Sequence, residues 1–311
     1  YEELMGAPPK ERMRMFAAGP ATNIFAAFIC LLMIGGLAGQ FVATSDDIHV
    51  RGIIQDQGAF NAGMKPWDTI ESIDGREIVG LDGFYEIMED YSANDTVLIS
   101  VLHQDGTREN LSMTFSDKYD YYSDLGWSES NLESLNISRG DPFLGIEGIS
   151  EGTAGIDRIA GPLSPRWEGN FAQKALVLPF HTLGLMVVPF ELQGVSMHPF
   201  EESLLEADDD GLASILGKSG LLFLTNLFFW LMWVNILLGF TNLIPMVPFD
   251  GGHLFRDLLR GVLKTVRRAG KKLKTWDLNP MWIEHISSKA SSISSLALLG
   301  MILFILIIPY I

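Results

Sequence analysis

The stretch Asn242-Leu-Ile-Pro-Met-Val-Pro-Phe-Asp250-Gly-Gly-His253 decides the fold, because it interrupts a segment that is otherwise apolar enough to cross a membrane. That segment runs from Ser219 to Phe249 and holds 31 residues without a charge, whereas a membrane span needs about 20. Pro245 and Pro248 each remove a backbone donor and are expected to break the helix. Backbone groups freed at membrane depth need partners from protein or from a water-filled cavity. The sequence therefore predicts a broken membrane helix.

The first charge after this break is the carboxylate of Asp250, which is followed by two glycines that let other groups come close. An ionised side chain at the centre of a span costs roughly 2.5–3.5 kcal/mol, so it is usually paired, bound to a metal or functional. A plainer interpretation is that the helix ends here, with Asp250 and His253 among the lipid headgroups. The spacing alone does not separate these two interpretations.

Composition limits the classes of protein to consider. The chain of 311 residues is 48% hydrophobic and has a positive mean hydropathy, yet its formal net charge is −16. It lacks the basic footprint of a nucleic-acid-binding protein, so we expect no nucleic-acid partner. The single cysteine, Cys30, lies in an apolar run and cannot form an internal disulfide. Long apolar runs with an acidic excess indicate a membrane protein with a solvated acidic domain.

A first transmembrane helix is predicted over residues 15–45, which contain no charged residue. The preceding segment, residues 1–14, carries Lys10, Arg12 and Arg14 near its end, and the positive-inside rule places it in the cytoplasm. Asn23 lies near the start of the helix. By itself it is best explained as a polar group that joins two helices by hydrogen bonding.

Residues 46–116 are predicted to form a soluble α+β domain inserted between membrane segments. The helical spacing of residues 81–91 lies between strand-like patterns in residues 48–54, 97–102 and 110–115. Residues 117–173 are rich in Ser, Gly, Asp and Tyr, and we expect a loop-rich extension of this domain.

Residues 174–217 are predicted to be an interfacial or re-entrant segment followed by an acidic loop. The uncharged run from Ala175 to Phe190 has only 16 residues, which is short for a span. If this run crossed the membrane, the basic residues of 256–289 would lie outside, against the positive-inside rule. We therefore expect that it does not cross, that the inserted domain lies outside, and that 256–289 is a cytoplasmic loop.

Two further spans are predicted at residues 218–255 and 290–311, on either side of the basic loop. The predicted fold class is thus a multi-pass α-helical membrane protein with an inserted α+β domain. Asp250 is expected near the cytoplasmic face.

Two motifs resemble those of one protein family. Asn242-x-x-Pro245-x-x-x-x-Asp250-Gly251 and the earlier Gly19-Pro20-x-x-Asn23 are similar to signatures of the site-2 protease family, the intramembrane zinc metalloproteases. The resemblance implies that Asp250 is the third zinc ligand.

The same resemblance implies roles for the neighbouring motif residues. Asn23 and Asn242 would orient the substrate strand or stabilise an oxyanion. The structural members of the two motifs would be Gly19, Pro20, Pro245 and Gly251.

The inserted domain has a resemblance of its own. Residues 62–75, Ala-Gly-Met-Lys-Pro-Trp-Asp-Thr-Ile-Glu-Ser-Ile-Asp-Gly, are similar to the signature of protease-associated PDZ domains, with Trp67 where glycine is usual. PDZ domains bind extended peptides at a sheet edge. The resemblance implies a peptide groove along Val50, Gly52, Ile53 and Ile54. The alternative is a domain that only packs or gates.

The family's catalytic histidine pair is missing from these residues. Zinc hydrolysis needs three protein ligands, which the family takes from an HExxH helix and the later Asp, and no HExxH occurs in residues 1–311. The first hypothesis is a site-2 protease-like enzyme for membrane-protein substrates, of which these residues are a fragment without the upstream HExxH helix, since the sequence starts at Tyr1. Its zinc site would be incomplete in this chain. The second is a noncatalytic membrane protein that binds membrane-protein tails through the PDZ-like domain.

Overall fold

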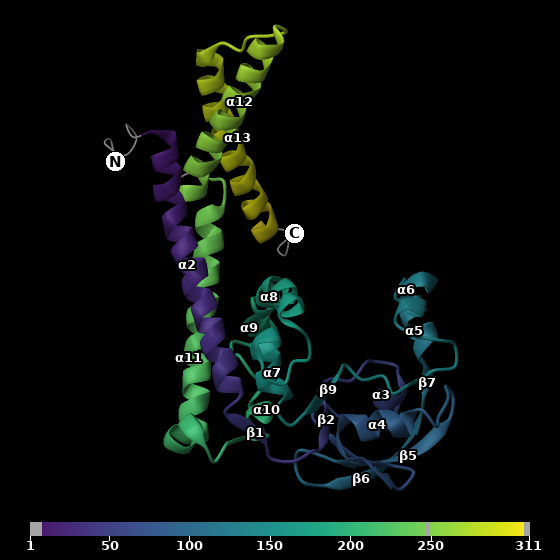
Figure 1. Ribbon diagram of the computed structural model, residues 1–311. Helices are drawn as coiled ribbons and strands as arrows, with labels where there is room; N and C mark the ends of the chain where they lie inside the picture. The colour runs from purple at the N-terminus through teal and green to yellow at the C-terminus, as the bar shows by residue number, and fades with distance from the viewer. Residues whose placement is uncertain (1–7, 247–248, 308–311) are drawn as a thin grey trace. The chain divides into compact units, whose positions relative to one another are not determined.

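A computed structural model describes residues 8–246 and 249–307, which form two compact units (Figure 1). One unit combines residues 1–33 with 227–311, and the other comprises residues 34–226. Of the predicted segments, residues 1–7, Pro248 and residues 308–311 lie outside the described residues.

The first unit is helical. It contains the first part of α2 (Pro9–Ala38), the last part of α11 (Gly211–Leu243), α12 (Asp250–Leu273) and α13 (Pro280–Ile307). α12 and α13 form an antiparallel hairpin (Figure 1). An ion pair of Arg260 with Glu284 joins the two helices, and a second of Arg267 with Asp277 joins α12 to the loop between them. Lys274 has a left-handed backbone, φ 56°, which ends α12.

The second unit contains an antiparallel sheet in the order β6-β5-β3-β2-β9, with β4 added to β3. Its strands are β2 (Ile48–Val50), β3 (Thr69–Ile73), β4 (Arg76–Glu77), β5 (Thr96–Leu102), β6 (Arg108–Thr114) and β9 (Ile149–Glu151). The turn between β3 and β4 uses Asp74 and Gly75, both at positive φ, as Asp-Gly hairpin turns require.

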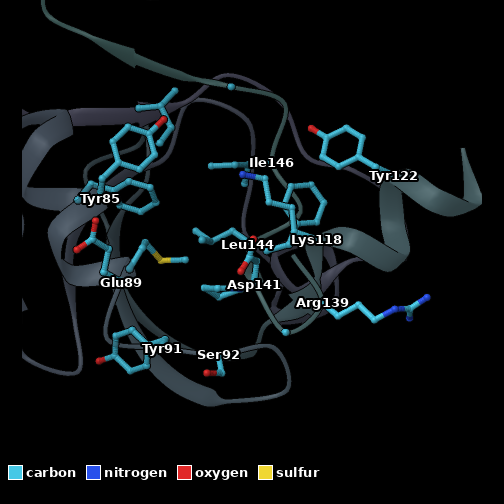
Figure 2. A pocket seen from close by; sticks show the side chains of 17 residues that line it. Tyr85, Glu89, Tyr91, Ser92, Lys118, Tyr122, Arg139, Asp141, Leu144 and Ile146 are labelled. Carbon is cyan, nitrogen blue, oxygen red and sulfur yellow. The ribbon is translucent and has the colours of Figure 1, made fainter. Parts of the chain in front are cut away.

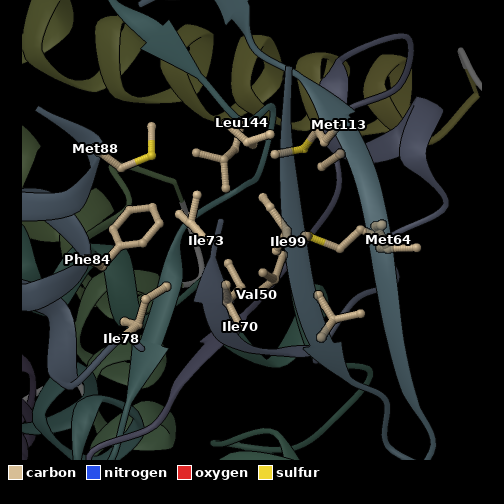
Figure 3. Close-up of a cluster of buried hydrophobic side chains, with 14 of the residues drawn as sticks. Val50, Met64, Ile70, Ile73, Ile78, Phe84, Met88, Ile99, Met113 and Leu144 are labelled. Atoms are coloured by element: carbon tan, nitrogen blue, oxygen red, sulfur yellow. The ribbon is translucent and has the colours of Figure 1, made fainter. Parts of the chain in front are cut away.

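The core of this sheet follows from alternation along the strands. In β5, Val97, Ile99 and Val101 are buried, whereas Leu98 between them is exposed. Phe84 of α4 (Gly80–Met88) packs into the same cluster, together with Met64, which follows α3 (Gly58–Ala62) (Figure 3). The predicted strands at 97–102 and 110–115 and the helix at 81–91 are therefore found, with their ends shifted by a few residues.

The residues after β6 form more secondary structure than the sequence predicted. The predicted loop-rich extension contains α5 (Lys118–Asp124), α6 (Glu129–Ser134) and α7 (Ala154–Ala160). Short strands β7 (Ser116–Asp117) and β8 (Pro142–Phe143) pair with each other. They enclose residues 118–141, which contain α5 and α6 and are called the α5–α6 excursion below. The sequence missed these helices because they have at most seven residues each and α5 buries none of its side chains.

The remaining elements of the second unit include one that carries a buried carboxylate. These are a 3-10 turn (Gly161–Leu163), α8 (Phe171–Leu185), α9 (Val188–Glu191), α10 (Pro199–Ser203) and β10 (Leu205–Ala207), which pairs with β1 (Phe41–Ala43). Glu201 of α10 is 1% exposed and accepts hydrogen bonds from Arg158 and Ser150. Burial by itself would raise the pKa of Glu201, but the guanidinium groups of Arg158 and Arg51 and the Ser150 hydroxyl lower it. The Glu201 carboxylate therefore stays ionised inside the unit.

Within the described residues, three helical segments are long and apolar enough to cross a membrane: Pro9–Ala38, Phe171–Glu191 and Gly211–Leu243. Two correspond to predicted spans, but α2 ends at Ala38 rather than at residue 45, because residues 41–43 pair as β1 with β10. The span expected at 218–255 starts after a kink at Gly217 and stops at Leu243. The third candidate contains the run that we expect not to cross. α13 covers most of the predicted last span.

Candidate functional site

The helix break predicted around the two prolines is present. α11 ends at Leu243 and α12 starts at Asp250, so Asn242 lies in the last turn of one helix and Asp250 in the first turn of the next. The backbone between them makes short-range hydrogen bonds, from Met246 N–H to the Ile244 carbonyl at 2.7 Å and from Phe249 N–H to the Met246 carbonyl at 2.9 Å. Pro245 thus lies in a non-helical link.

Gly251 is required by the close approach of two backbone segments. A β-carbon at this position would overlap the carbonyl oxygens of both Leu243 and Ile244. Gly251 itself is buried. The absence of a side chain therefore lets the start of α12 lie directly against the end of α11, which holds Asp250 beside the broken helix.

Serines of α13 donate hydrogen bonds to two backbone carbonyls beside the break, one in the non-helical link and one in the first turn of α12. Ser294 Oγ donates to the Pro245 carbonyl at 3.2 Å, and Ser291 Oγ donates to the Gly252 carbonyl at 3.3 Å. Buried carbonyls without a partner would be costly at membrane depth. The motifs did not predict a role for these two serines, although the Ser-rich start of the predicted last span was a signal for them.

The structure brings the two sequence motifs together. A β-carbon at Gly19 would lie 3.7 Å from Asp250 Oδ2, so the Asp250 carboxylate faces α2 at the first motif. One at Gly239 would lie 3.5 Å from the Pro20 carbonyl oxygen and 3.6 Å from Asn23 Cβ. Asn242 follows Gly239 by three residues, which places it on the same side of α11. The sequence alone could not show this proximity of residues more than 200 positions apart.

A buried ion pair holds α12 against α2 beyond Asp250. Arg12 Nη2 donates to Asp257 Oδ1 at 2.6 Å and Arg12 Nε donates to Asp257 Oδ2 at 3.1 Å. Arg12 and Asp257 are 6% and 3% exposed. One turn nearer to Asp250, the rings of Phe16 and His253 stack with centroids 4.8 Å apart. These contacts align the first turns of α12 antiparallel to α2.

The described residues do not by themselves fit a zinc ion. Within residues 8–246 and 249–307, no three His, Cys, Asp or Glu side chains come together as a metal site. Asp250 offers one carboxylate, whereas a zinc site needs three protein ligands and an open position. Asp250 alone therefore does not complete a zinc site.

The edge expected to bind peptide is occupied by the chain itself. β2 pairs with β9, Val50 lying opposite Ile149. The pairing continues beyond β2: the Gly52 carbonyl accepts from Glu147 N–H, Ile53 bridges Ile146, and Ile54 N–H donates to the Gly145 carbonyl. No edge is left for an added strand along Val50, Gly52, Ile53 and Ile54, so these residues support the neighbouring strand.

A cavity lies on the other side of that strand. It has a volume of about 890 Å³ and is bounded by α4, by residues 142–149 and by residues of the α5–α6 excursion (Figure 2). Phe84 and Met88 come from α4, and Leu144 and Ile146 come from the facing segment. β9 is the last strand of the sheet order, so its outer edge has no strand neighbour in the described sheet. The open edge of the sheet thus lies one strand away from the expected position.

Trp67 explains one departure from the PDZ-like pattern. Its φ is 69°, a backbone conformation that favours glycine. Its ring stacks on His198 with centroids 4.2 Å apart and also contacts Phe200. These contacts offset the strain that a side chain brings at this position.

Comparisons with known proteins complete the description of the site. The family model described as Peptidase family M50 matches residues 2–275. No curated protein matches the chain. Similar solved structures include the PDZ domains of SdrC-like proteins from Listeria monocytogenes (20% identity, TM-score 0.25, covering 33% of this chain and 87% of that chain) and Listeria innocua (22%, 0.24, 33% and 92%). Another is an aminopeptidase N family protein from Idiomarina loihiensis (20%, 0.19, 40% and 17%). Because these likenesses are so distant, the description of the inserted domain rests on its own topology.

Proposed function

Since this chain belongs to peptidase family M50, we propose that it is part of a membrane-embedded metalloprotease of the site-2 type that cleaves membrane-protein substrates. The observation that carries the proposal is the position of the Asp250 carboxylate, which follows the helix break and faces Gly19 of α2. An ionisable side chain near a membrane span is rare without a function. Here it lies where both sequence motifs meet.

In this proposal Asp250 gives one carboxylate ligand to zinc, and the remaining ligands come from outside residues 1–311. Asn23 and Asn242 flank the same region and offer side-chain amides that can hydrogen-bond to the backbone of an unwound substrate. In this proposal the unwound substrate segment lies beside the link around Pro245, which is not a regular helix. The Asp250 end faces the cytoplasm and the inserted domain lies outside, as the positive-inside rule predicts.

The inserted domain is proposed to hold extended peptides of the substrate. The outer edge of β9 offers backbone groups to an added strand, and the cavity beside it accepts side chains. This role does not depend on catalysis. It would remain if the protein were a noncatalytic binding protein.

The test is an Asp250→Ala substitution in the complete protein, assayed for cleavage of a membrane-anchored reporter and for bound zinc. We expect cleavage to be abolished and zinc content to fall, with the thermal stability largely kept. Asp210→Asn, at an exposed position of the acidic loop, is the matched control and should cleave normally. Undiminished cleavage by Asp250→Ala would exclude the assignment of Asp250. No cleavage by the unmodified protein would favour the noncatalytic alternative.

A further inference from the structure

One side of α12 has its positive charges balanced by neighbours within the helical hairpin (Figure 1). Arg260 pairs with Glu284 of α13, and Arg267 pairs with Asp277 of the connecting loop at 2.8 Å. Lys271 also pairs with Asp277, at 3.2 Å. The acidic residues of the hairpin are thus used on the side of α12 that faces α13.

A second set of cations on α12 is not balanced in this way. Lys264, Arg268 and Lys272 follow each other at intervals of four residues, so they lie in one row along the helix. We call these three residues the basic row. All three are exposed, and none of them forms an ion pair within 4.0 Å with any residue of 8–246 and 249–307. Their charge is available to an anionic partner.

An exposed apolar row runs beside the basic row. Leu258, Val262 and Val266 are also spaced by four residues, and Leu273 continues the same side of the helix seven residues later. We call these four residues the apolar row. Each of them is between 40% and 66% exposed, so the described part of the chain leaves the row largely uncovered. The two rows lie about 120° apart around α12, at 3.6 residues per turn.

The position of α12 in the chain keeps it near a membrane surface. The helix starts six residues after α11, which is long and apolar enough to span, and α13 leads into the uncharged run 290–311. Trp276 and Trp282 at the far end of the hairpin are both exposed, and tryptophan is enriched where membranes meet water.

The charge of the basic row selects among the surfaces that could cover the apolar row. A second copy of this helix would bring a second basic row, and like charges repel. A bilayer with anionic lipids instead offers phosphate groups next to apolar chains. A helix with an apolar face bordered by Lys and Arg is suited to lie in this boundary.

We propose that α12 docks on the surface of a membrane that contains anionic phospholipids. The apolar row enters the boundary between headgroups and acyl chains, and the basic row binds the phosphate groups beside it. This inference does not depend on Asp250, on zinc or on proteolysis.

The experiment follows an environment-sensitive fluorophore at Val266→Cys in the complete protein, reconstituted in lipid nanodiscs. The native Cys30 is buried and should stay unlabelled. One set of discs contains phosphatidylcholine alone and the other contains phosphatidylserine as well, and both carry lipids with a spin label on the acyl chain. We expect the spin label to quench the fluorophore strongly in the anionic discs and weakly in the neutral discs. Added salt should reduce the quenching in the anionic discs, because it screens exposed charges.

Two triple variants test the basic row. The combination of Lys264→Gln, Arg268→Gln and Lys272→Gln should lower the ratio of docked to undocked helices in anionic discs about 100-fold, roughly five-fold for each cation lost. The matched control combines Lys264→Arg, Arg268→Lys and Lys272→Arg, which keeps every charge and should dock like the unmodified protein. Because all three positions are exposed and have no ion pair in the described residues, both variants should keep the melting temperature.

Two results would overturn the inference. Quenching that is equal in neutral and anionic discs, or unchanged in the glutamine variant, would mean that the basic row does not recognise anionic lipid. A fluorophore that is shielded from iodide in both discs but not quenched by the spin-labelled lipid would assign the apolar row to a protein contact, such as a second copy. The cleavage assay of Asp250→Ala is unaffected by either result.

Discussion

Because glycine at position 251 has no side chain, the start of α12 can pack directly against the end of α11. Gly251 lies against the carbonyl oxygens of Leu243 and Ile244, and any β-carbon there forces the backbone apart. Gly261, ten residues further along α12, lies on an exposed face, and a β-carbon added there would meet no atom of the described residues within 4 Å. The two glycines therefore have different reasons to be glycine.

Gly251→Ala is predicted to destabilise the protein by roughly 1–3 kcal/mol or more, as overpacking does, and to abolish cleavage by moving Asp250. Gly261→Ala should stabilise α12 by up to about 1 kcal/mol because alanine favours helix. Thermal denaturation in detergent measures both effects. Equal stability of the two variants would contradict the close approach described for Gly251.

The buried pair of Arg12 and Asp257 gives a second prediction for single residues. Asp257→Ala leaves the Arg12 guanidinium without its buried carboxylate, and we expect a loss of about 3–5 kcal/mol. Replacing both by Met and Leu should recover much of that loss, since apolar side chains of similar volume avoid a buried charge. Melting temperatures of Arg12→Met, of Asp257→Leu and of the double variant that combines them test this. Additive losses would mean that the two side chains do not act as a pair.

At the scale of elements, buried polar groups join strands that are distant in the chain. His103 follows β5, and its ring nitrogens lie 2.7 Å from Asp68 Oδ1, just before β3, and 3.1 Å from Glu109 Oε2 of β6. The hydrogen bond to Asp68 and then that to Glu109 raise the pKa of His103 above its ordinary value of 6.5. Protonated His103 therefore links the end of β5 to the start of β3 and to β6.

This pKa shift predicts how the stability of the inserted domain depends on pH. Because the folded-state pKa of His103 is raised, its stabilising contribution is complete below about pH 6.5 and is lost as the pH rises through the raised value. In His103→Gln this part of the pH dependence should disappear, whereas in His285→Gln, at an exposed position of α13, it should persist. Melting temperatures between about pH 5.5 and 9 provide the measurement. An unchanged profile in His103→Gln would exclude this role.

At the scale of the whole molecule, the path of the chain through the membrane depends on one helical segment. Phe171–Glu191 has the length and apolarity to cross, yet the topology expected from the charge pattern makes it an interfacial or re-entrant segment that does not cross. Only accessibility from each side of the membrane decides between them.

We predict that cysteines placed at Glu168 and Glu191 are labelled by a membrane-impermeant maleimide from the same, outer side. Cysteines at Ser214 and Ser288, which α11 should separate, serve as the control and should be labelled from opposite sides. The native Cys30 is buried and should remain unlabelled. Labelling of positions 168 and 191 from opposite sides would show that the segment crosses.

By itself, the sequence determined the features whose signal is local. Uncharged runs predicted α2 and α11, the prolines predicted the break before Asp250, and alternation predicted β5 and β6, because each pattern records how a short segment meets water, lipid or a core. The two motifs also indicated the peptidase family whose model matches residues 2–275. The ends of elements were less predictable, as when pairing with β10 ended α2 early.

Only the tertiary structure decided which distant residues meet. It placed Asp250 beside Gly19, gave the Pro245 and Gly252 carbonyls their serine partners from α13, and filled the expected peptide edge at Val50 with β9. These contacts join residues far apart in the chain, and strand order and helix packing carry no local signature. The physical reason is that a side chain's neighbours across the fold are set by how the elements pack and not by its own segment.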